Sequence, residues 1–253
     1  MLQEVAAARH IVVSCGTSEI DGYVFGAGLT FLKRHSIVHL NSRPLIDPVT
    51  YLMGGAIFRP KSMSADSLGR NALDIAPLGE LVDMYHSHEA TEYHDKIFAL
   101  LGMSSDNPVA AGLLPDYKLS WEILFKQLVV SLLGRDVTVE TWPGTVMAII
   151  EGKGCIIGKV ASLNVRDNDS RQDVDNITSR NMTGPLSHKT IWTTPMSAKP
   201  VQVGDFVCLL HEAANAVIAR PCDDHFSIIR VTVPLKMEQL IIAFVHDFRL
   251  LWD

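Results

Sequence analysis

Six side chains that can bind a metal or move a proton crowd into one short stretch near the middle of the chain. They are His86, His88, Glu89, Glu92, His94 and Asp95. Imidazole and carboxylate groups suit zinc or iron. The spacing, a His-x-His pair with a third histidine six residues later, matches no recognised metal site. We therefore expect no metal here, but a polar connector between two helices in which Asp95 is the N-cap of the second helix.

A glycine-rich stretch and two arginines could bind a phosphate or another anion. Gly152-Lys-Gly-Cys-Ile-Ile-Gly158 lacks both the Gly-Lys-Ser/Thr ending and the following helix of a phosphate loop. Apolar stretches on both sides predict a β-hairpin turn at Gly152–Gly154 instead. Arg220 and Arg230 lie in predicted strands, where we expect surface or ion-paired side chains rather than anion ligands. The sequence has no Gly-x-Ser-x-Gly nucleophile motif.

The composition is that of an ordinary folded protein. The chain has 253 residues, 47% hydrophobic and 20% charged, enough for one large core or two small ones. A formal charge of -6 argues against a nucleic-acid partner, which needs clustered Lys and Arg. The scattered cysteines show no zinc spacing and are expected to be reduced thiols in a cytoplasmic protein: Cys15, Cys155, Cys208 and Cys222.

Neither a targeting signal nor a membrane span is expected. The N-terminus shows no basic region followed by an apolar run, as a secretory signal would have. The apolar run Leu240–Val245 is far shorter than the ~20 residues of a membrane-spanning helix.

The first half of the chain is predicted to be helical. Its clearest helix is Trp121–Leu133, because apolar residues recur at helical spacing, Ser120 is a natural N-cap and Gly134 fits the position after the last turn. The β-branched run His10–Cys15 predicts a buried strand. Other helices are expected at residues 2–9, 23–34, 49–58 and 77–85, with a polar loop at residues 59–71.

The second half is predicted to be rich in β-strands. Residues 163–185 are polar and are expected to form an excursion from the fold. A small antiparallel sheet or a partly closed barrel would bury the strands. The chain is thus expected to be α+β, with a helical region at residues 1–134 and a β-rich region at residues 135–253. Strands are expected at residues 137–141, 146–150, 155–160, 206–210, 216–219 and 226–233.

Several stretches of the chain, taken together, carry a family resemblance. They are Gln3-Glu4 followed by Val12-Val-Ser-Cys-Gly16, Asp95-Lys96-Ile-Phe-Ala-Leu-Leu-Gly102 followed by Leu114–Trp121, Val203-Gly204-Asp205-Phe-Val-Cys-Leu-Leu210 followed by Arg220, and Phe244–Trp252. These blocks resemble the fungal heterokaryon-incompatibility (HET) proteins, which detect non-self after hyphal fusion, and the tail resembles the members that also carry ankyrin repeats. The chain departs from the family pattern at Glu92-Tyr-His94, where the family commonly reads Asp-Pro-Arg.

The resemblance covers the end of the HET domain and the region after it. The first conserved blocks of the family, including a Tyr-Cys-Trp-Gly strand, have no counterpart here, so the chain looks like a HET protein that begins late in its signature domain. The resemblance therefore implies remnant α/β elements, similar to those of TIR domains, at the N-terminus. It also implies structural roles for a set of motif residues: Gln3, Asp95, Lys96, Gly102, Gly204 and Asp205.

Glu4 is the one candidate catalytic residue that the resemblance suggests. The HET block around Gln3-Glu4 resembles the Trp-Cys-x-x-Glu helix of TIR domains, whose glutamate cleaves NAD. A carboxylate would stabilise an oxocarbenium-like ribosyl transition state, as in glycoside hydrolysis. The alternative is a solvated side chain close to a fraying chain end.

The function implied by the resemblance is non-self recognition and cell-death signalling through an unidentified protein partner, with no cofactor, nucleic acid or membrane. One alternative is an enzyme or accessory factor in small-molecule (secondary) metabolism, or an NAD-cleaving enzyme. Another alternative is a truncated paralogue without independent activity.

Overall fold

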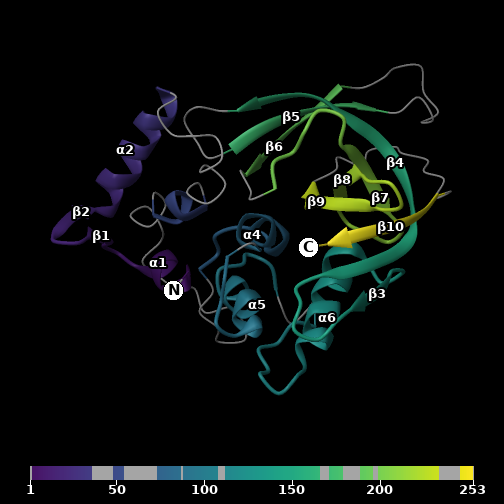
Figure 1. Cartoon of the computed structure of the whole chain (residues 1–253), viewed down its shortest axis with the longest axis horizontal. Helices are drawn as coiled ribbons and strands as arrows, with labels where there is room; N and C mark the ends of the chain where they lie inside the picture. Colours follow the sequence, from purple (N-terminus) through teal and green to yellow (C-terminus); the bar gives the residue numbers. More distant parts are fainter. Residues whose placement is uncertain are drawn as a thin grey trace.

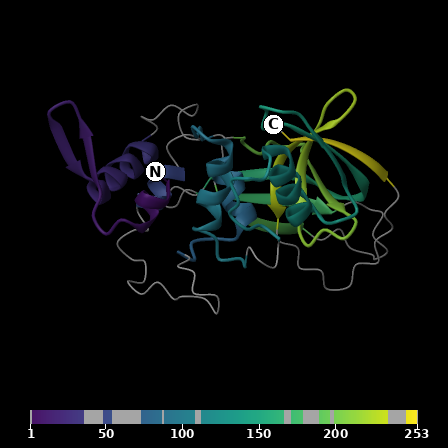
Figure 2. The ribbon, with the colours of Figure 1, turned by 90° about the horizontal axis from the view of Figure 1, so that it is seen from below.

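The computed structural model of the chain is shown in Figures 1 and 2. It describes residues 2–35, 48–53, 73–86, 88–107, 112–165, 171–178, 189–195, 199–233 and 246–252. Helices and strands are mixed, and the second half of the chain forms a multi-stranded sheet.

The chain begins with a small unit of helix, hairpin and helix. Its elements are α1 (Leu2–Ala7), β1 (Val12–Cys15), β2 (Ser18–Asp21) and α2 (Gly22–Arg34). Asp21 caps α2, because its Oδ1 accepts hydrogen bonds from the backbone N–H groups of Tyr23 (2.9 Å) and Val24 (3.1 Å). In both views the hairpin and α2 lie at the opposite end of the molecule from the large sheet (Figures 1 and 2).

The strand predicted at His10–Cys15 forms, but the prediction that it is buried is wrong. Among the described strands β1 pairs with β2 alone, and Val12 is 48% exposed. An apolar run indicates a strand but does not show whether a second layer covers it.

A group of helices packs against the sheet (Figure 1). The helices are α4 (Leu78–Tyr85), α5 (Tyr93–Leu101) and α6 (Trp121–Leu133). Helix α6 has the predicted bounds, with Ser120 Oγ accepting a hydrogen bond from the backbone N–H of Ile123 (3.4 Å). Gly134 follows it with a φ of 97°, a conformation that favours glycine.

Helix α5 begins earlier than predicted. Glu92 occupies the N-cap position, so Asp95 lies inside the first turn and is not the cap. Contacts distant in sequence explain the shift: the ring of Tyr93 lies 5.4 Å from that of Trp121, and its hydroxyl donates a hydrogen bond to the carbonyl of Gly144 (2.9 Å).

Residues 48–53 are helical, within the helix predicted at residues 49–58. The rest of that helix, the loop predicted at residues 59–71 and the apolar run at residues 240–245 lie outside the described residues.

The second half of the chain forms a sheet that closes on itself in part. Its strands are β3 (Thr138–Thr141), β4 (Ala148–Val165), β5 (Arg171–Thr178), β6 (Lys189–Pro195), β7 (Phe206–Leu210), β8 (Ala216–Pro221), β9 (Phe226–Val233) and β10 (His246–Trp252). The strand order is β10-β9-β8-β7-β4-β5-β6, with β3 also paired to β4. Because β10 pairs with both β9 and β4, the strands from β4 through β7, β8 and β9 to β10 form a closed ring. The expected partly closed barrel is therefore present.

The hairpin turn predicted at Gly152–Gly154 is wrong, because β4 runs straight through it. A Cβ on Gly154 would lie 2.7 Å from the carbonyl oxygen of Leu209 and 3.0 Å from the ring of Phe248. A Cβ on Gly152 would lie 3.0 Å from the side chain of Val137. These glycines let neighbouring chains approach β4 closely, which is the other common reason for glycine within a strand.

The polar excursion predicted at residues 163–185 is also wrong in its first part. Strand β4 continues to Val165, and β5 pairs with it antiparallel from Gln172 to Thr178. Polar side chains are compatible with a sheet whose backbone groups are satisfied by pairing.

The hydrophobic core joins both halves of the chain. One cluster includes helix residues such as Leu81 and Phe125 together with Ile150, Val231 and Trp252 from the sheet. A second cluster, which includes Val174, Val207 and Ile218, lies among the strands.

Arg230 is not at the surface, which was the first of the two roles expected for it. Its residue is 1% exposed, and it lies in β9 beneath α4. Burial lowers the pKa of Arg230, while the carboxylates of Asp83 and Glu80 act in the opposite direction. Asp83 also accepts a hydrogen bond from the backbone N–H of Val231 (2.9 Å). One carboxylate therefore interacts with both the backbone of the sheet and the buried guanidinium of Arg230.

None of the helices in the described ranges combines the length and the apolar character needed to cross a lipid bilayer.

Candidate functional site

The motif residues at the start of the chain and at the end of α5 meet in the structure. A Cβ on Gly102 would lie 1.7 Å from Nε2 of Gln3, so the side chain of Gln3 lies directly against the backbone of Gly102. Gly102 has a φ of -71°, which any residue adopts. A side chain at position 102 would displace only the flexible end of Gln3, so the contact shows where Gln3 lies and does not by itself require glycine.

The other motif residues of α5 contact the segment before α6. The hydroxyl of Tyr117 donates a hydrogen bond to Oδ1 of Asp95 (2.6 Å). Lys96 lines a small, mostly apolar cavity of about 40 Å³ together with His86, Trp121 and Trp252. Burial lowers the pKa of Lys96.

Gly204 and Asp205 form a turn that an arginine holds in place. Asp205 is 2% exposed, and Arg220 donates to its carboxylate from Nε (2.9 Å) and Nη2 (3.0 Å). The backbone N–H of Gln202 donates to the same carboxylate (2.7 Å). Gly204 has a φ of 102°, which a side chain would strain. Arg220 is thus ion-paired, one of the two roles predicted for it.

The candidate catalytic residue Glu4 is an exposed side chain on α1. It does not line the open polar pocket of β4 and β10 or the small cavity beside Lys96.

The histidine-rich segment does not converge on one point. Nδ1 of His86 lies 3.2 Å from the carbonyl of Val82, whereas Nε2 of His94 lies 2.8 Å from the carbonyl of Leu119. Burial lowers the pKa of His86 to about 4, so its ring is neutral at pH 7. These two rings thus face different backbone carbonyls, one in the same helix and one before α6.

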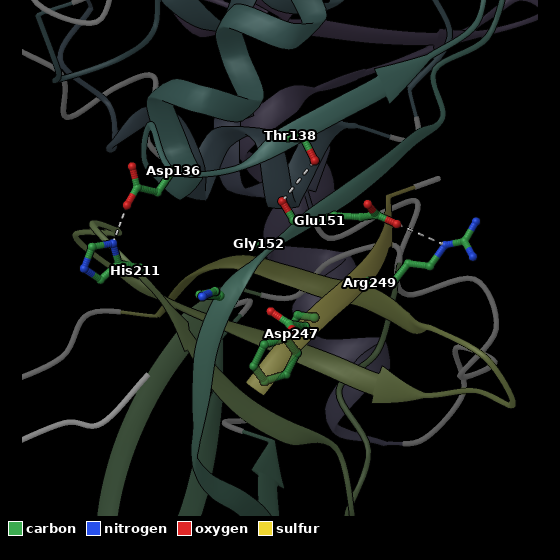
Figure 3. A pocket seen from close by; sticks show the side chains of 9 residues that line it. Asp136, Thr138, Glu151, Gly152, His211, Asp247 and Arg249 are labelled. Carbon is green, nitrogen blue, oxygen red and sulfur yellow. Dashed lines mark hydrogen bonds and ion pairs between the residues drawn. The ribbon is translucent and has the colours of Figure 1, made fainter. Parts of the chain in front are cut away.

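An open polar pocket of about 870 Å³ lies on the sheet (Figure 3). It is lined by Asp136, Thr138, Glu151, Gly152, Lys153, His211, Asp247, Phe248 and Arg249. Strands β4 and β10 form its floor and place charges of opposite sign across from each other, Lys153 with Asp247 and Glu151 with Arg249. Nε of Arg249 lies 3.8 Å from Oε1 of Glu151. The charges of the floor therefore compensate one another.

At one side of this pocket a histidine contacts one carboxylate and lies near a second. Nδ1 of His211 contacts Oδ2 of Asp136, and Glu212 completes a group whose possible ligand atoms lie within 4.8 Å of one another. Gly134 makes the contact possible, because a Cβ there would lie 3.0 Å from the carbonyl oxygen of His211.

The chemistry available to this group is limited. The side chains of His211 and Asp136 are 46% and 51% exposed, so water weakens their interaction. Asp136 can orient the imidazole of His211 as a base, and a base needs a hydroxyl group to deprotonate. Thr138 is the one hydroxyl side chain lining the pocket, and its Oγ1 lies 3.4 Å from the carbonyl of Glu151. The pocket has the character of the polar outer face of a sheet. Residues 136 and 211 are 75 positions apart, and no local sequence signal links them.

A second candidate surface is apolar and lies on α2. Five residues of this helix are exposed: Tyr23 (49%), Val24 (55%), Phe31 (60%), Ala27 and Gly28. Their spacing places all of them within an arc of roughly 140° of the helix surface. We call this surface the α2 face. In the sequence, the apolar residues continue around the whole helix, and this pattern indicates that some of them are exposed. The predicted strands and helices did not show which side of the helix that would be.

No protein-family model matches the chain, and neither the curated proteins nor the solved structures provide a match. The function must therefore be argued from the geometry and from the motif residues.

Proposed function

We propose that this chain is a HET-like protein of non-self recognition and cell-death signalling, which acts in the cytoplasm by binding another protein chain. In this proposal, α1 and β1 are the end of a TIR-like domain, and the remaining elements form the region that follows it. The binding step requires neither a cofactor nor catalysis.

The α2 face is the observation that carries this proposal. A helix on the surface of a water-soluble protein normally turns its polar residues toward solvent. On α2 the exposed residues of this arc are Tyr, Val, Ala, Gly and Phe. Contiguous exposed apolar surface of this kind is typical of a protein-binding site.

The contacts of the motif residues support the family assignment. Gln3 lies against Gly102, and Asp205 accepts a forked ion pair from Arg220. Both contacts join segments far apart in the sequence, and such residues would be retained because the architecture depends on them. The NAD-cleaving alternative has less support, because Glu4 is exposed and lines neither described cavity.

The test is controlled expression in a filamentous fungus. Expression of the chain should arrest hyphal growth, and Phe31→Glu should remove the effect, because a carboxylate in the middle of the apolar contact cannot be desolvated without a large free-energy cost. Val203→Glu is the matched control, since Val203 is also exposed (64%) but lies beside β7. Normal growth with the unchanged chain would contradict the proposal and would favour a paralogue without activity.

A further inference from the structure

We propose that Asp136, His211 and Glu212 together bind Zn²⁺ or a divalent cation of similar ligand preference. The bound cation would tie the end of α6 to the turn between β7 and β8. This inference goes beyond the proposed function, which does not use these residues.

The first argument is the combination of donor atoms. The group offers one imidazole nitrogen and two carboxylate oxygens, and these atoms lie within 4.8 Å of one another. Imidazole suits Zn²⁺ and its neighbours in the first transition series, whereas Mg²⁺ and Ca²⁺ take oxygen ligands. A cation with bonds of about 2.0–2.2 Å requires its ligand atoms roughly 3–4 Å apart. Small rotations of these partly exposed side chains would therefore complete the site.

The third donor distinguishes this group from an ordinary ion pair. His225 and Asp224, in the turn between β8 and β9, also form an exposed pair, with Nδ1 and Oδ1 2.7 Å apart. In the part of the chain that the structure describes, the His211 group alone brings three such side chains close enough to share one ion. Glu212 is the additional donor, and the His225 pair is a matched control.

The second argument is the support that the backbone gives to the ligands. The N–H of His211 donates a hydrogen bond to the carbonyl of Lys153 in β4 (2.8 Å), which fixes the start of the turn. Gly134, at the end of α6, lets the turn come close, because a Cβ there would lie 3.0 Å from the carbonyl carbon of Glu212. Asp136 follows two residues later. A helix end and a strand end therefore hold the ligands in place, as a metal site requires.

The site also has access to water. Asp136 and His211 face each other at the side of the open polar pocket, which both residues line (Figure 3). Three protein ligands leave at least one coordination position of Zn²⁺ for water. The open pocket can supply that water.

The first experiment is equilibrium dialysis of the full chain against Zn²⁺. The unchanged chain should have a zinc site that each of His211→Gln, Asp136→Asn and Glu212→Gln weakens at least about 10-fold, as expected for the loss of one ligand. His225→Gln should leave this site unchanged. Excess Mg²⁺ should not displace the Zn²⁺, because Mg²⁺ does not favour an imidazole ligand.

The second experiment is thermal unfolding with and without Zn²⁺. At a free concentration about 100 times the Kd, Zn²⁺ should raise the midpoint temperature of the unchanged chain by about 5–10 °C. Glu212→Gly is the most informative variant, because Glu212 has a φ of 61°, a conformation that favours glycine. Without Zn²⁺ this variant should be at least as stable as the unchanged chain, and Zn²⁺ should not stabilise it.

The outcomes separate this inference from the proposed function. Zinc binding that survives all three ligand substitutions, or that is lost with His225→Gln, overturns the assignment. Displacement by Mg²⁺, or a Glu212→Gly variant that Zn²⁺ still stabilises, does the same. Growth arrest by a chain that binds no Zn²⁺ would contradict this inference alone, and zinc binding without growth arrest would contradict the proposed function alone.

Discussion

Individual residues in this chain are constrained more by their neighbours across the fold than by their own backbone conformation. Gly154 has no room for a Cβ, because the carbonyl oxygen of Leu209 and the ring of Phe248 occupy its position. Asp205 is also constrained by its neighbours, because its carboxylate accepts hydrogen bonds from both Arg220 and the backbone N–H of Gln202. Each of these constraints predicts the effect of a single substitution.

Gly154→Ala should destabilise the fold, because its Cβ would lie 2.7 Å from the backbone carbonyl of Leu209. The backbone of Leu209 and the buried ring of Phe248 leave little room for relaxation, so we expect a loss of about 1–3 kcal/mol in the free energy of unfolding. Gly26→Ala is the matched control, because nothing lies within 4 Å of its Cβ position inside α2, and alanine should stabilise the helix slightly. Urea unfolding measures both variants, and equal effects would contradict the close contact.

His86 should make the stability depend on pH. Burial lowers the pKa of His86 to about 4, below the value of 6.5 of an unburied histidine. Between these values the unfolded chain binds the proton and the folded chain does not, so stability falls as the pH falls from 6.5 to 4. The shift corresponds to about 3 kcal/mol at most.

The measurement is urea unfolding of the chain and of His86→Leu between pH 4 and pH 7. The free energy of unfolding of the variant should depend less on pH, with a remaining slope from His88, whose pKa burial also lowers. Parallel curves for the two proteins would show that the pKa of His86 is the same in the folded and the unfolded chain, which contradicts the effect of burial.

The contact between α4 and β9 contains two buried charged groups, one from each element. Asp83 is 6% exposed and Arg230 is 1% exposed, and the two interact electrostatically. Asp83→Ala leaves the buried guanidinium without this carboxylate and removes the acceptor of the Val231 N–H. Loss of one partner of a buried pair typically costs 3–5 kcal/mol, so we expect roughly that decrease in stability.

The double variant Asp83→Leu with Arg230→Met provides the control for this element. Apolar residues of similar size avoid the cost of a buried charge, so the double variant should recover most of the stability lost in Asp83→Ala. Thermal unfolding followed by circular dichroism measures the series. A double variant as unstable as Asp83→Ala would show that the carboxylate acts mainly on the backbone of β9.

The sequence predicts elements well where local signals agree with the tertiary contacts. Helix α6 has its predicted bounds because its cap, its apolar stripe and its final glycine all indicate the same segment. The prediction of a turn at Gly152–Gly154 was wrong because glycine is common both in turns and in crowded strands. The sequence alone does not show that the ring of Phe248 lies against Gly154. The contact between Asp136 and His211 was missed for the same reason, since only the folded sheet brings the two together.

The molecule as a whole is held together across the boundary between its helical and β-rich halves. The ring of Phe125 in α6 lies 5.6 Å from that of Trp252 in β10, and the indole N–H of Trp121 donates a hydrogen bond to the carbonyl of Thr145 (2.6 Å). Val231 donates its N–H to Asp83 of α4. The helices therefore cover one face of the sheet and satisfy some of its polar groups.

We expect that residues 135–253 expressed alone do not fold, although they contain every strand of the closed ring. Without the helices, Trp252, Val231 and Ile150 would lose their cover, and each exposed side chain of this kind costs about 1.5–3 kcal/mol. When only a few such side chains are exposed, their summed cost exceeds the net free energy of unfolding of a typical domain. The full chain, in contrast, should unfold in a single transition when circular dichroism and tryptophan fluorescence are followed together. A fragment with a cooperative unfolding transition of its own would show that the second core cluster, which lies among the strands, is enough to hold the barrel closed.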